Sequence, residues 1–96
     1  MGNYILSSAA DKDVDRIYNF TVKKFGINQA RKYLFGLEKH LELLAQNPYI
    51  GISINKAKHN YLLSLYVSHT ILYKVIDEGI YLARVLHKNR DIKRHI

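Results

Sequence analysis

The last thirteen residues of the chain, RVLHKNRDIKRHI (84–96), hold most of the side chains that could do chemistry. They include five bases and one acid, so this end contributes +4 of the formal net charge of +7. The bases are Arg84, Lys88, Arg90, Lys93 and Arg94. Such a basic end speeds association with nucleic acid, an acidic protein segment or an anionic membrane, without choosing among them.

Arg84 and His87 are candidates for specific roles because they lie at the end of a strand-like stretch, IYLARVLH (80–87). Strand alternation predicts two faces: Tyr81, Ala83, Val85 and His87 on one, and Leu82, Arg84 and Leu86 on the other. Arg84 suits either an ion pair or a contact with a phosphate or a partner. His87 suits either a structural hydrogen bond or general-base catalysis, which would need a nucleophile nearby.

Other common chemistries lack a sequence signature. Cysteine is absent, so no disulfide or thiolate site is possible. The five histidines lack metal-site spacing, and no HExxH motif, glycine-rich phosphate loop or GxSxG motif occurs. We therefore predict no metal and no cofactor.

Four tyrosines fall on expected strands, where they could stack bases beside cations or simply pack. They are Tyr61, Tyr66, Tyr73 and Tyr81. Because Tyr73 and Tyr81 are surrounded by apolar residues, packing is favoured, and we expect no direct sequence-specific binding of nucleic acid.

Two helices are predicted after a short strand at 3–7. Ser8 to Asp11 resembles a capping box, and apolar residues recur at helical spacing up to Gly26, a predicted C-terminal glycine. Asn28 is expected to cap the second helix, which ends at Asn47-Pro48 because proline disfavours helical geometry in the residue before it.

After a loop of about a dozen residues, three strands are predicted at 61–67, 70–76 and 80–87, with reversals at 68–69 and 77–79. The order is β-α-α-β-β-β. We therefore expect an α+β fold with a helical hairpin on one face of a mainly antiparallel sheet.

The 96 residues fit one domain, 1–96. The first residues lack the features of a signal peptide, and no uninterrupted apolar run reaches membrane-spanning length. The sequence thus predicts a cytoplasmic protein with no membrane partner.

Two long segments resemble the ParE toxins of the RelE/ParE toxin–antitoxin superfamily. Residues 7–51, SSAADKDVDRIYNFTVKKFGINQARKYLFGLEKHLELLAQNPYIG, are similar to the helical hairpin of the family with its LLAxNPxxG close. Residues 68–91, SHTILYKVIDEGIYLARVLHKNRD, are similar to its sheet motif. The resemblance covers nearly the whole chain and implies the RelE/ParE toxin-like fold.

The resemblance implies a toxin that stabilises the cleaved-DNA complex of DNA gyrase, through its A subunit, and that a ParD-like antitoxin neutralises in a hetero-oligomer. Two alternatives remain: a RelE-like ribosome-dependent mRNA endoribonuclease, or an inactive, antitoxin-bound relative. If the chain is a ribonuclease, the catalytic candidates are Lys74, Arg84 and His87. The catalytic tyrosine of the ribonucleases has no counterpart after His87, which favours a non-enzymatic gyrase poison.

The resemblance also implies two contact surfaces. The expected target-binding residues are Arg84, His87, Lys88, Arg90, Lys93 and Arg94. The expected antitoxin-binding residues are Ile17, Phe20, Leu34, Leu37 and Tyr73.

Overall fold

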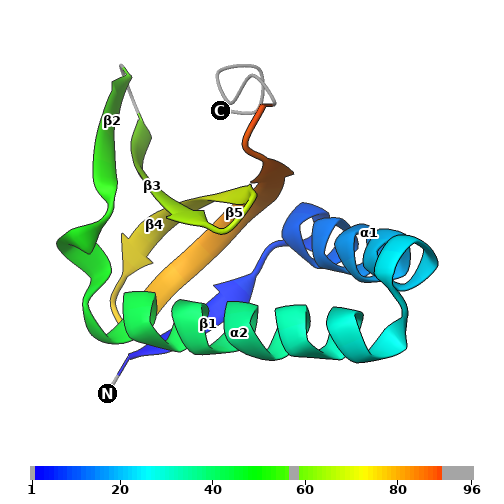
Figure 1. Ribbon diagram of the computed structural model, residues 1–96. Helices are drawn as coiled ribbons and strands as arrows, with labels where there is room; N and C mark the ends of the chain where they lie inside the picture. Colours follow the sequence, from blue (N-terminus) through cyan, green and yellow to red (C-terminus); the bar gives the residue numbers. More distant parts are fainter. Residues whose placement is uncertain (1, 57–58, 90–96) are drawn as a thin grey trace.

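The computed structural model of the protein describes residues 2–56 and 59–89 (Figure 1). Its elements follow in the order β1 (Asn3–Leu6), α1 (Ser8–Phe25), α2 (Ile27–Gln46), the 3-10 helix η1 (Pro48–Ile50), β2 (Ile52–Lys56), β3 (His59–Tyr66), β4 (His69–Ile76) and β5 (Gly79–His87). No helix in the described ranges is long and apolar enough to cross a membrane.

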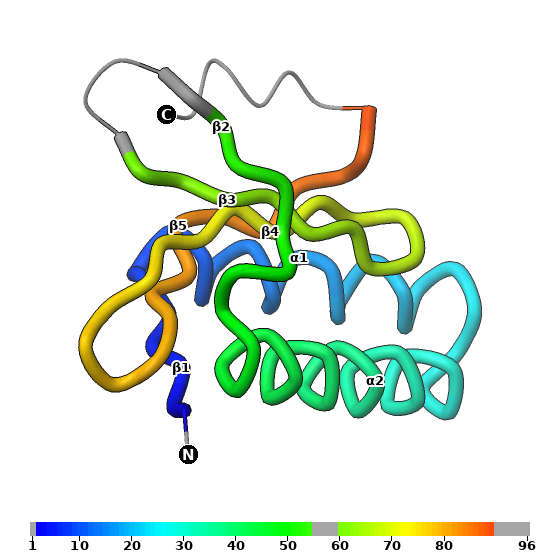
Figure 2. Tube along the Cα trace, turned by 90° about the vertical axis from the view of Figure 1, so that its left-hand side faces the viewer, coloured from blue at the N-terminus to red at the C-terminus, as the bar shows by residue number. Residues whose placement is uncertain are grey.

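The strands form one sheet in the order β1-β5-β4-β3-β2. The first strand pairs with the last in parallel, and the other neighbours are antiparallel. Both helices lie on the same side of this sheet, as the two views show (Figures 1 and 2). The predicted α+β fold, with a helical hairpin on one face of a mainly antiparallel sheet, is confirmed.

The core lies between α2 and the sheet. Leu37, Leu41 and Leu44 recur at helical spacing and are at most 3% exposed. They meet strand residues that are equally buried: Ile71, Tyr73, Ile80, Leu82 and Val85. This stripe of leucines is what holds the second helix against the sheet.

The helix ends agree with the sequence only in part. Gly26 has the positive φ (93°) expected of a helix-ending glycine, and α2 ends just before Asn47-Pro48 as predicted. The cap of α1 is Ser7, whose hydroxyl accepts a hydrogen bond from the Ala10 N–H, so the capping box predicted from Ser8 was wrong. Asn28 lies inside α2 and does not cap it.

The sheet contains one strand that the sequence did not predict. β2 occupies part of the expected loop and pairs with β3 in the register Ile52↔Leu63. It was missed because only Ile52 and Ile54 alternate before polar residues follow, and because a strand at the edge of a sheet has one neighbour.

The two tight reversals differ from prediction by one residue or less. Asp77-Glu78 joins β4 to β5 at the predicted place. The other turn is Val67-Ser68, and His69 already pairs with Tyr66 and with His87. His69 is therefore a strand residue with neighbours on both sides.

An irregularity in β5 changes which side chains share a face. Leu72 pairs with Arg84 but the next residue, Tyr73, pairs with Leu82, so Ala83 has no partner in this register. Leu82 and Val85 consequently both enter the core. The two faces predicted by strict alternation along 80–87 were wrong, because a bulge breaks the period of two.

Gly36 in the middle of α2 has a packing reason. A Cβ at this position would overlap the hydroxyl oxygen of Tyr66, because the hydroxyl end of that ring lies against the helix there. Tyr66 also packs against Tyr33 with ring centroids 5.4 Å apart and against His40 at 5.2 Å. A glycine lowers helix stability, but here it allows an aromatic cluster to join α2 to β3.

Tyr73 fixes the corner after α2. Its hydroxyl donates to the Pro48 carbonyl (2.8 Å) and accepts from the Gly51 N–H (3.1 Å), while its ring lies fully buried. Burial raises the pKa of Tyr73, so the neutral hydroxyl persists at physiological pH. The segment NPYIG is thereby tied to the core.

Candidate functional site

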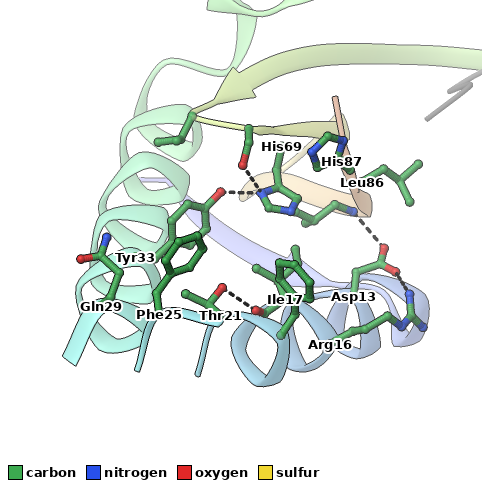
Figure 3. Close-up of a pocket in the computed structure, with 14 residues that line it drawn as sticks. Asp13, Arg16, Ile17, Thr21, Phe25, Gln29, Tyr33, His69, Leu86 and His87 are labelled. Atoms are coloured by element: carbon green, nitrogen blue, oxygen red, sulfur yellow. Dashed lines mark hydrogen bonds and ion pairs between the residues drawn. The ribbon is translucent and has the colours of Figure 1, made fainter. Parts of the chain in front are cut away.

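A half-open groove of about 650 Å³ lies where α1, the start of α2, the β3–β4 turn and the end of β5 meet (Figure 3). We call it the helix–turn groove. It is lined by Asp13, Arg16, Ile17, Phe20, Thr21, Phe25, Gln29, Tyr33, Val67, Ser68, His69, Val85, Leu86 and His87. Ile17, Phe20 and Phe25 form its apolar wall on α1, and we call the part lined by Tyr33, His69 and His87 its polar end.

Large apolar side chains of the groove remain exposed. Phe20 is 58% and Phe25 63% exposed, and the Lys24 ammonium lies 5.6 Å and 6.0 Å from the centres of their rings. Ile17, one turn before Phe20, lines the same wall. Exposed aromatic side chains along a concave surface are typical of a site covered by another molecule.

The polar end of the groove is built from an aromatic and two imidazoles. A hydrogen bond joins the Tyr33 hydroxyl to His69 Nδ1, and the rings of His69 and His87 lie edge to face with centroids 5.8 Å apart. Burial and then the neighbouring His87 lower the pKa of His69. His69 is therefore neutral at physiological pH and presents a weakly polar surface.

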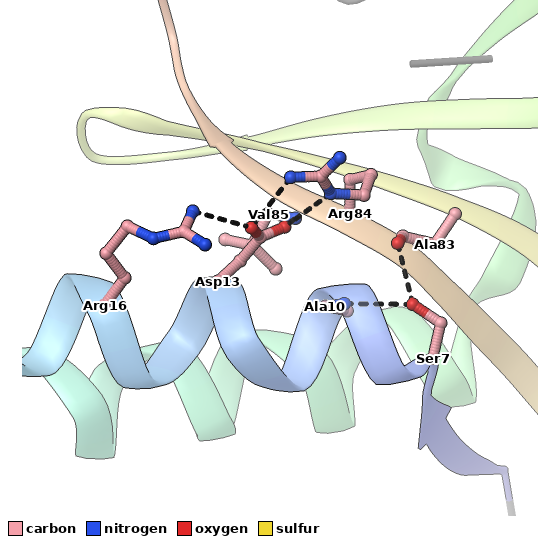
Figure 4. Close-up of polar contacts among 7 residues, drawn as sticks. All are labelled: Ser7, Ala10, Asp13, Arg16, Ala83, Arg84 and Val85. Carbon is pink, nitrogen blue, oxygen red and sulfur yellow. Dashed lines mark hydrogen bonds and ion pairs between the residues drawn. The ribbon is translucent and has the colours of Figure 1, made fainter.

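Three residues donate hydrogen bonds to the Asp13 carboxylate (Figure 4). Its carboxylate accepts from Arg84 Nε (2.7 Å) and Nη2 (2.9 Å), from the Val85 N–H (3.0 Å) and from Arg16 Nη1 (3.3 Å). Burial alone would raise the pKa of Asp13, but the hydrogen bonds from Arg84 and Val85 and the charges of Arg84 and Arg16 bring it below its ordinary value. The side chain of Asp13 is 1% exposed and that of Arg84 22%.

These contacts close an edge of the sheet that β1 is too short to cover. β1 pairs with residues 79–82 of β5, and beyond that point the Ser7 hydroxyl donates to the Ala83 carbonyl (2.8 Å). Asp13 then accepts from the Val85 N–H. Side chains at the start of α1 thus satisfy backbone groups that a longer first strand would have paired.

The three ribonuclease candidates have different neighbours. The Lys74 ammonium lies 4.8 Å from the centre of the Tyr61 ring, Arg84 pairs with Asp13, and His87 faces His69 in the groove. Within residues 2–56 and 59–89, no group of three or more His, Asp or Glu side chains is arranged to hold a metal ion.

The predicted target-binding residues divide into described and undescribed positions. Arg84 forms the ion pair above, while His87 and Lys88 are exposed at the end of β5. Arg90, Lys93 and Arg94 lie outside the described residues. The role of this set in target binding stays a prediction.

The predicted antitoxin-binding residues also divide. Ile17 and Phe20 line the groove, and Leu34 is half-buried between the two helices. Leu37 and Tyr73 are 1% and 0% exposed in the core, so neither offers surface to a partner in this structure. Both residues lie on the face of their helix or strand that packs into the core. The role of the set in antitoxin binding stays a prediction.

Of the residues that line the groove, the sequence singled out only Ile17, Phe20 and His87 as site residues, and those it missed include Phe25, Tyr33, Val67 and His69. Phe25 falls within the apolar spacing of the first predicted helix, and His69 falls in a predicted reversal, so neither position indicates a site. The one local signal was an imidazole at the start of one strand and another at the end of the next, which a tight hairpin brings opposite each other.

Comparisons with known proteins agree on one family. The sequence matches the ParE toxin of type II toxin–antitoxin system, parDE, over residues 4–92. It is 35% identical over 94 residues to Toxin ParE1 of Mycobacterium tuberculosis, covering 97% of this chain and 96% of that protein.

Two solved structures share the fold. A chain of the chromosomal ParDE TA system from P. aeruginosa has a TM-score of 0.73 at 18% identity, covering 91% of this chain and 96% of the other. A chain of the toxin–antitoxin complex RelBE2 from Mycobacterium tuberculosis has a TM-score of 0.60 at 16% identity, covering 91% and 98%.

Proposed function

Because this chain belongs to the ParE toxin family of type II toxin–antitoxin systems, we propose that it stabilises the cleaved-DNA complex of DNA gyrase and that a ParD-like antitoxin holds it inactive. The observation that carries the proposal is the ParE match over residues 4–92. In this proposal the toxin acts in the cytoplasm, where it traps DNA gyrase on cleaved DNA and catalyses no reaction itself.

The position of Arg84 supports a poison over a ribonuclease. RNA cleavage at the 2′-hydroxyl needs cations free to stabilise a pentavalent phosphate. The guanidinium of Arg84 makes two hydrogen bonds to Asp13, whose carboxylate also holds the backbone of β5. The guanidinium of Arg84 therefore stabilises the fold through Asp13, which supports a structural role over contact with a phosphate.

The helix–turn groove supports the antitoxin partner. Its exposed Phe20 and Phe25 offer apolar area to a segment that packs against α1. Arg16 lines the groove with a side chain that is 69% exposed, the exposed Lys88 directly follows the lining residue His87, and the chain carries a net charge of +7. We infer that the antitoxin places an apolar segment bearing acidic residues in this groove.

The test is a gyrase cleavage assay with purified, antitoxin-free protein, supercoiled plasmid and ATP. Linear DNA is scored after treatment with detergent and protease. We expect linear DNA in proportion to the toxin, and none when equimolar ParD-like antitoxin is added.

Charge reversal at the basic end provides the matched comparison. Arg90→Glu with Arg94→Glu should abolish cleavage, whereas Lys23→Glu with Lys32→Glu, the same change in charge at exposed helix positions, should retain it. Circular dichroism checks that both variants fold. Intact plasmid together with cut transcripts in cells would instead establish the ribonuclease.

A further inference from the structure

The β3–β4 turn contains an unexpected residue for its backbone conformation. Val67 has φ 51°, the only positive φ among the described residues other than glycine. It is the first of two residues that join Tyr66 to His69, which pair with each other. A positive φ at this position of a two-residue hairpin is normally supplied by Gly, Asn or Asp. A β-branched side chain is strained there.

Packing within the free chain does not offset this strain. Val67 is 66% exposed and belongs to the groove lining, not to the core cluster. Two hydrogen bonds hold the turn. The Lys88 N–H donates to the Ser68 carbonyl (2.9 Å), and the Tyr33 hydroxyl is hydrogen-bonded to His69 Nδ1. A glycine at 67 would keep these contacts and remove the strain.

We propose that Val67 is a binding anchor for the antitoxin. The turn holds the isopropyl group of Val67 at the rim of the helix–turn groove, and the strained backbone that this requires lowers the stability of the free toxin. The inference rests on the proposed antitoxin site. The occupant is an antitoxin segment with an aliphatic or aromatic side chain against Val67, continuous with its contacts to Phe20 and Phe25. The turn carries this side chain rigidly, because the strands on both sides of it are paired.

The test compares Val67→Asn with the wild type, because asparagine adopts a positive φ at little cost. Two quantities are measured: the melting temperature of the free toxin, and its Kd for the ParD-like antitoxin encoded with it. We expect the melting temperature to rise by about 4 °C, as relief of roughly one strained residue predicts. We expect the Kd to weaken about 10-fold, as the loss of one buried valine predicts.

Two further variants separate the causes. Val67→Thr keeps the branched Cβ but replaces one methyl group with a hydroxyl, so it should weaken binding without raising the melting temperature. Leu65→Asn removes an equally exposed aliphatic side chain (62%) of the same hairpin that does not line the groove, so its Kd should stay at the wild-type value.

The outcomes distinguish this inference from the proposed antitoxin site. Phe20→Asp reports on the groove itself. If Phe20→Asp weakens binding while Val67→Asn binds like the wild type, the anchor is refuted and the groove stands. If both bind like the wild type, the antitoxin site is elsewhere. A melting temperature that falls in Val67→Asn would refute the strain.

Discussion

Replacing Asp13 with asparagine hardly changes the volume of the side chain but should cost a large share of the stability of the fold. In Asp13→Asn the charge is lost and an amide N–H₂ faces the donors of Arg84 or Val85. Breaking a buried ion pair by neutralising one partner costs about 3–5 kcal/mol. Because the Arg84 side chain is 22% exposed, water replaces part of the lost interaction, and we expect the lower end, about 3 kcal/mol.

A loss of this size is readily measured. A 96-residue domain has a total stability of roughly 5–14 kcal/mol, so the variant should lose a large share of it. With a urea m-value of about 1.5 kcal/mol/M, the unfolding midpoint should fall by about 2 M. Urea titration followed by circular dichroism at pH 7 measures the change directly.

A double-mutant cycle assigns the loss to the pair. Arg84→Met removes the charge and keeps much of the stem, and Asp13→Asn with Arg84→Met completes the cycle. We expect a coupling energy above about 1 kcal/mol, whereas Arg16→Ala, at an exposed side chain, should cost less than about 1 kcal/mol. Additive single effects, or a cost of Asp13→Asn below 1 kcal/mol, would refute the reasoning.

Three further predictions concern the tyrosine contacts and the histidines. Gly36→Ala should destabilise the wild type despite the better helix propensity of alanine. The same substitution should cost at least about 1 kcal/mol less in a Tyr66→Phe background, because the overlapping hydroxyl is gone, and urea unfolding of the four proteins measures the difference. Tyr73→Phe should cost about 1–3 kcal/mol by the same assay, because the carbonyl and the amide that its hydroxyl binds lose their partner, and an unchanged midpoint would contradict that role. Burial lowers the pKa of His69 and His40, so stability should be fully present above about pH 6.5 and fall as the pH drops below it; His69→Gln should flatten this slope, and equal slopes would refute it.

Most of the fold could be predicted from the sequence because its signals are local. Gly26 and Asn47-Pro48 each act within a few residues, and both mark helix ends in the structure. β2 and the bulge at Ala83 could not be predicted in this way, because both are defined by what the neighbouring strand does.

The candidate site could be predicted only along α1. Ile17 and Phe20 follow from one helix face, but the polar end depends on contacts between distant residues. Tyr33 and His69 are 36 residues apart, and His69 meets His87 only through strand pairing. For Arg84 the sequence left two roles open, an ion pair or a contact with a phosphate or a partner. It could not identify the ion-pair partner, because Asp13 lies 71 residues away in the chain.

The closing of the β5 edge by α1 has a consequence for how the chain folds during synthesis. The contacts of Ser7 with Ala83 and of Asp13 with Arg84 span 76 and 71 residues, and β1 pairs with the last strand. These contacts join the first element to the last, so contact order is high at this point and loop closure is slow. On the ribosome, the two helices emerge long before β5 and have no completed sheet to cover. The protein can therefore complete this edge of its sheet only once β5 is available, and a nascent chain that stops before β5 lacks the partners of β1, Ser7 and Asp13.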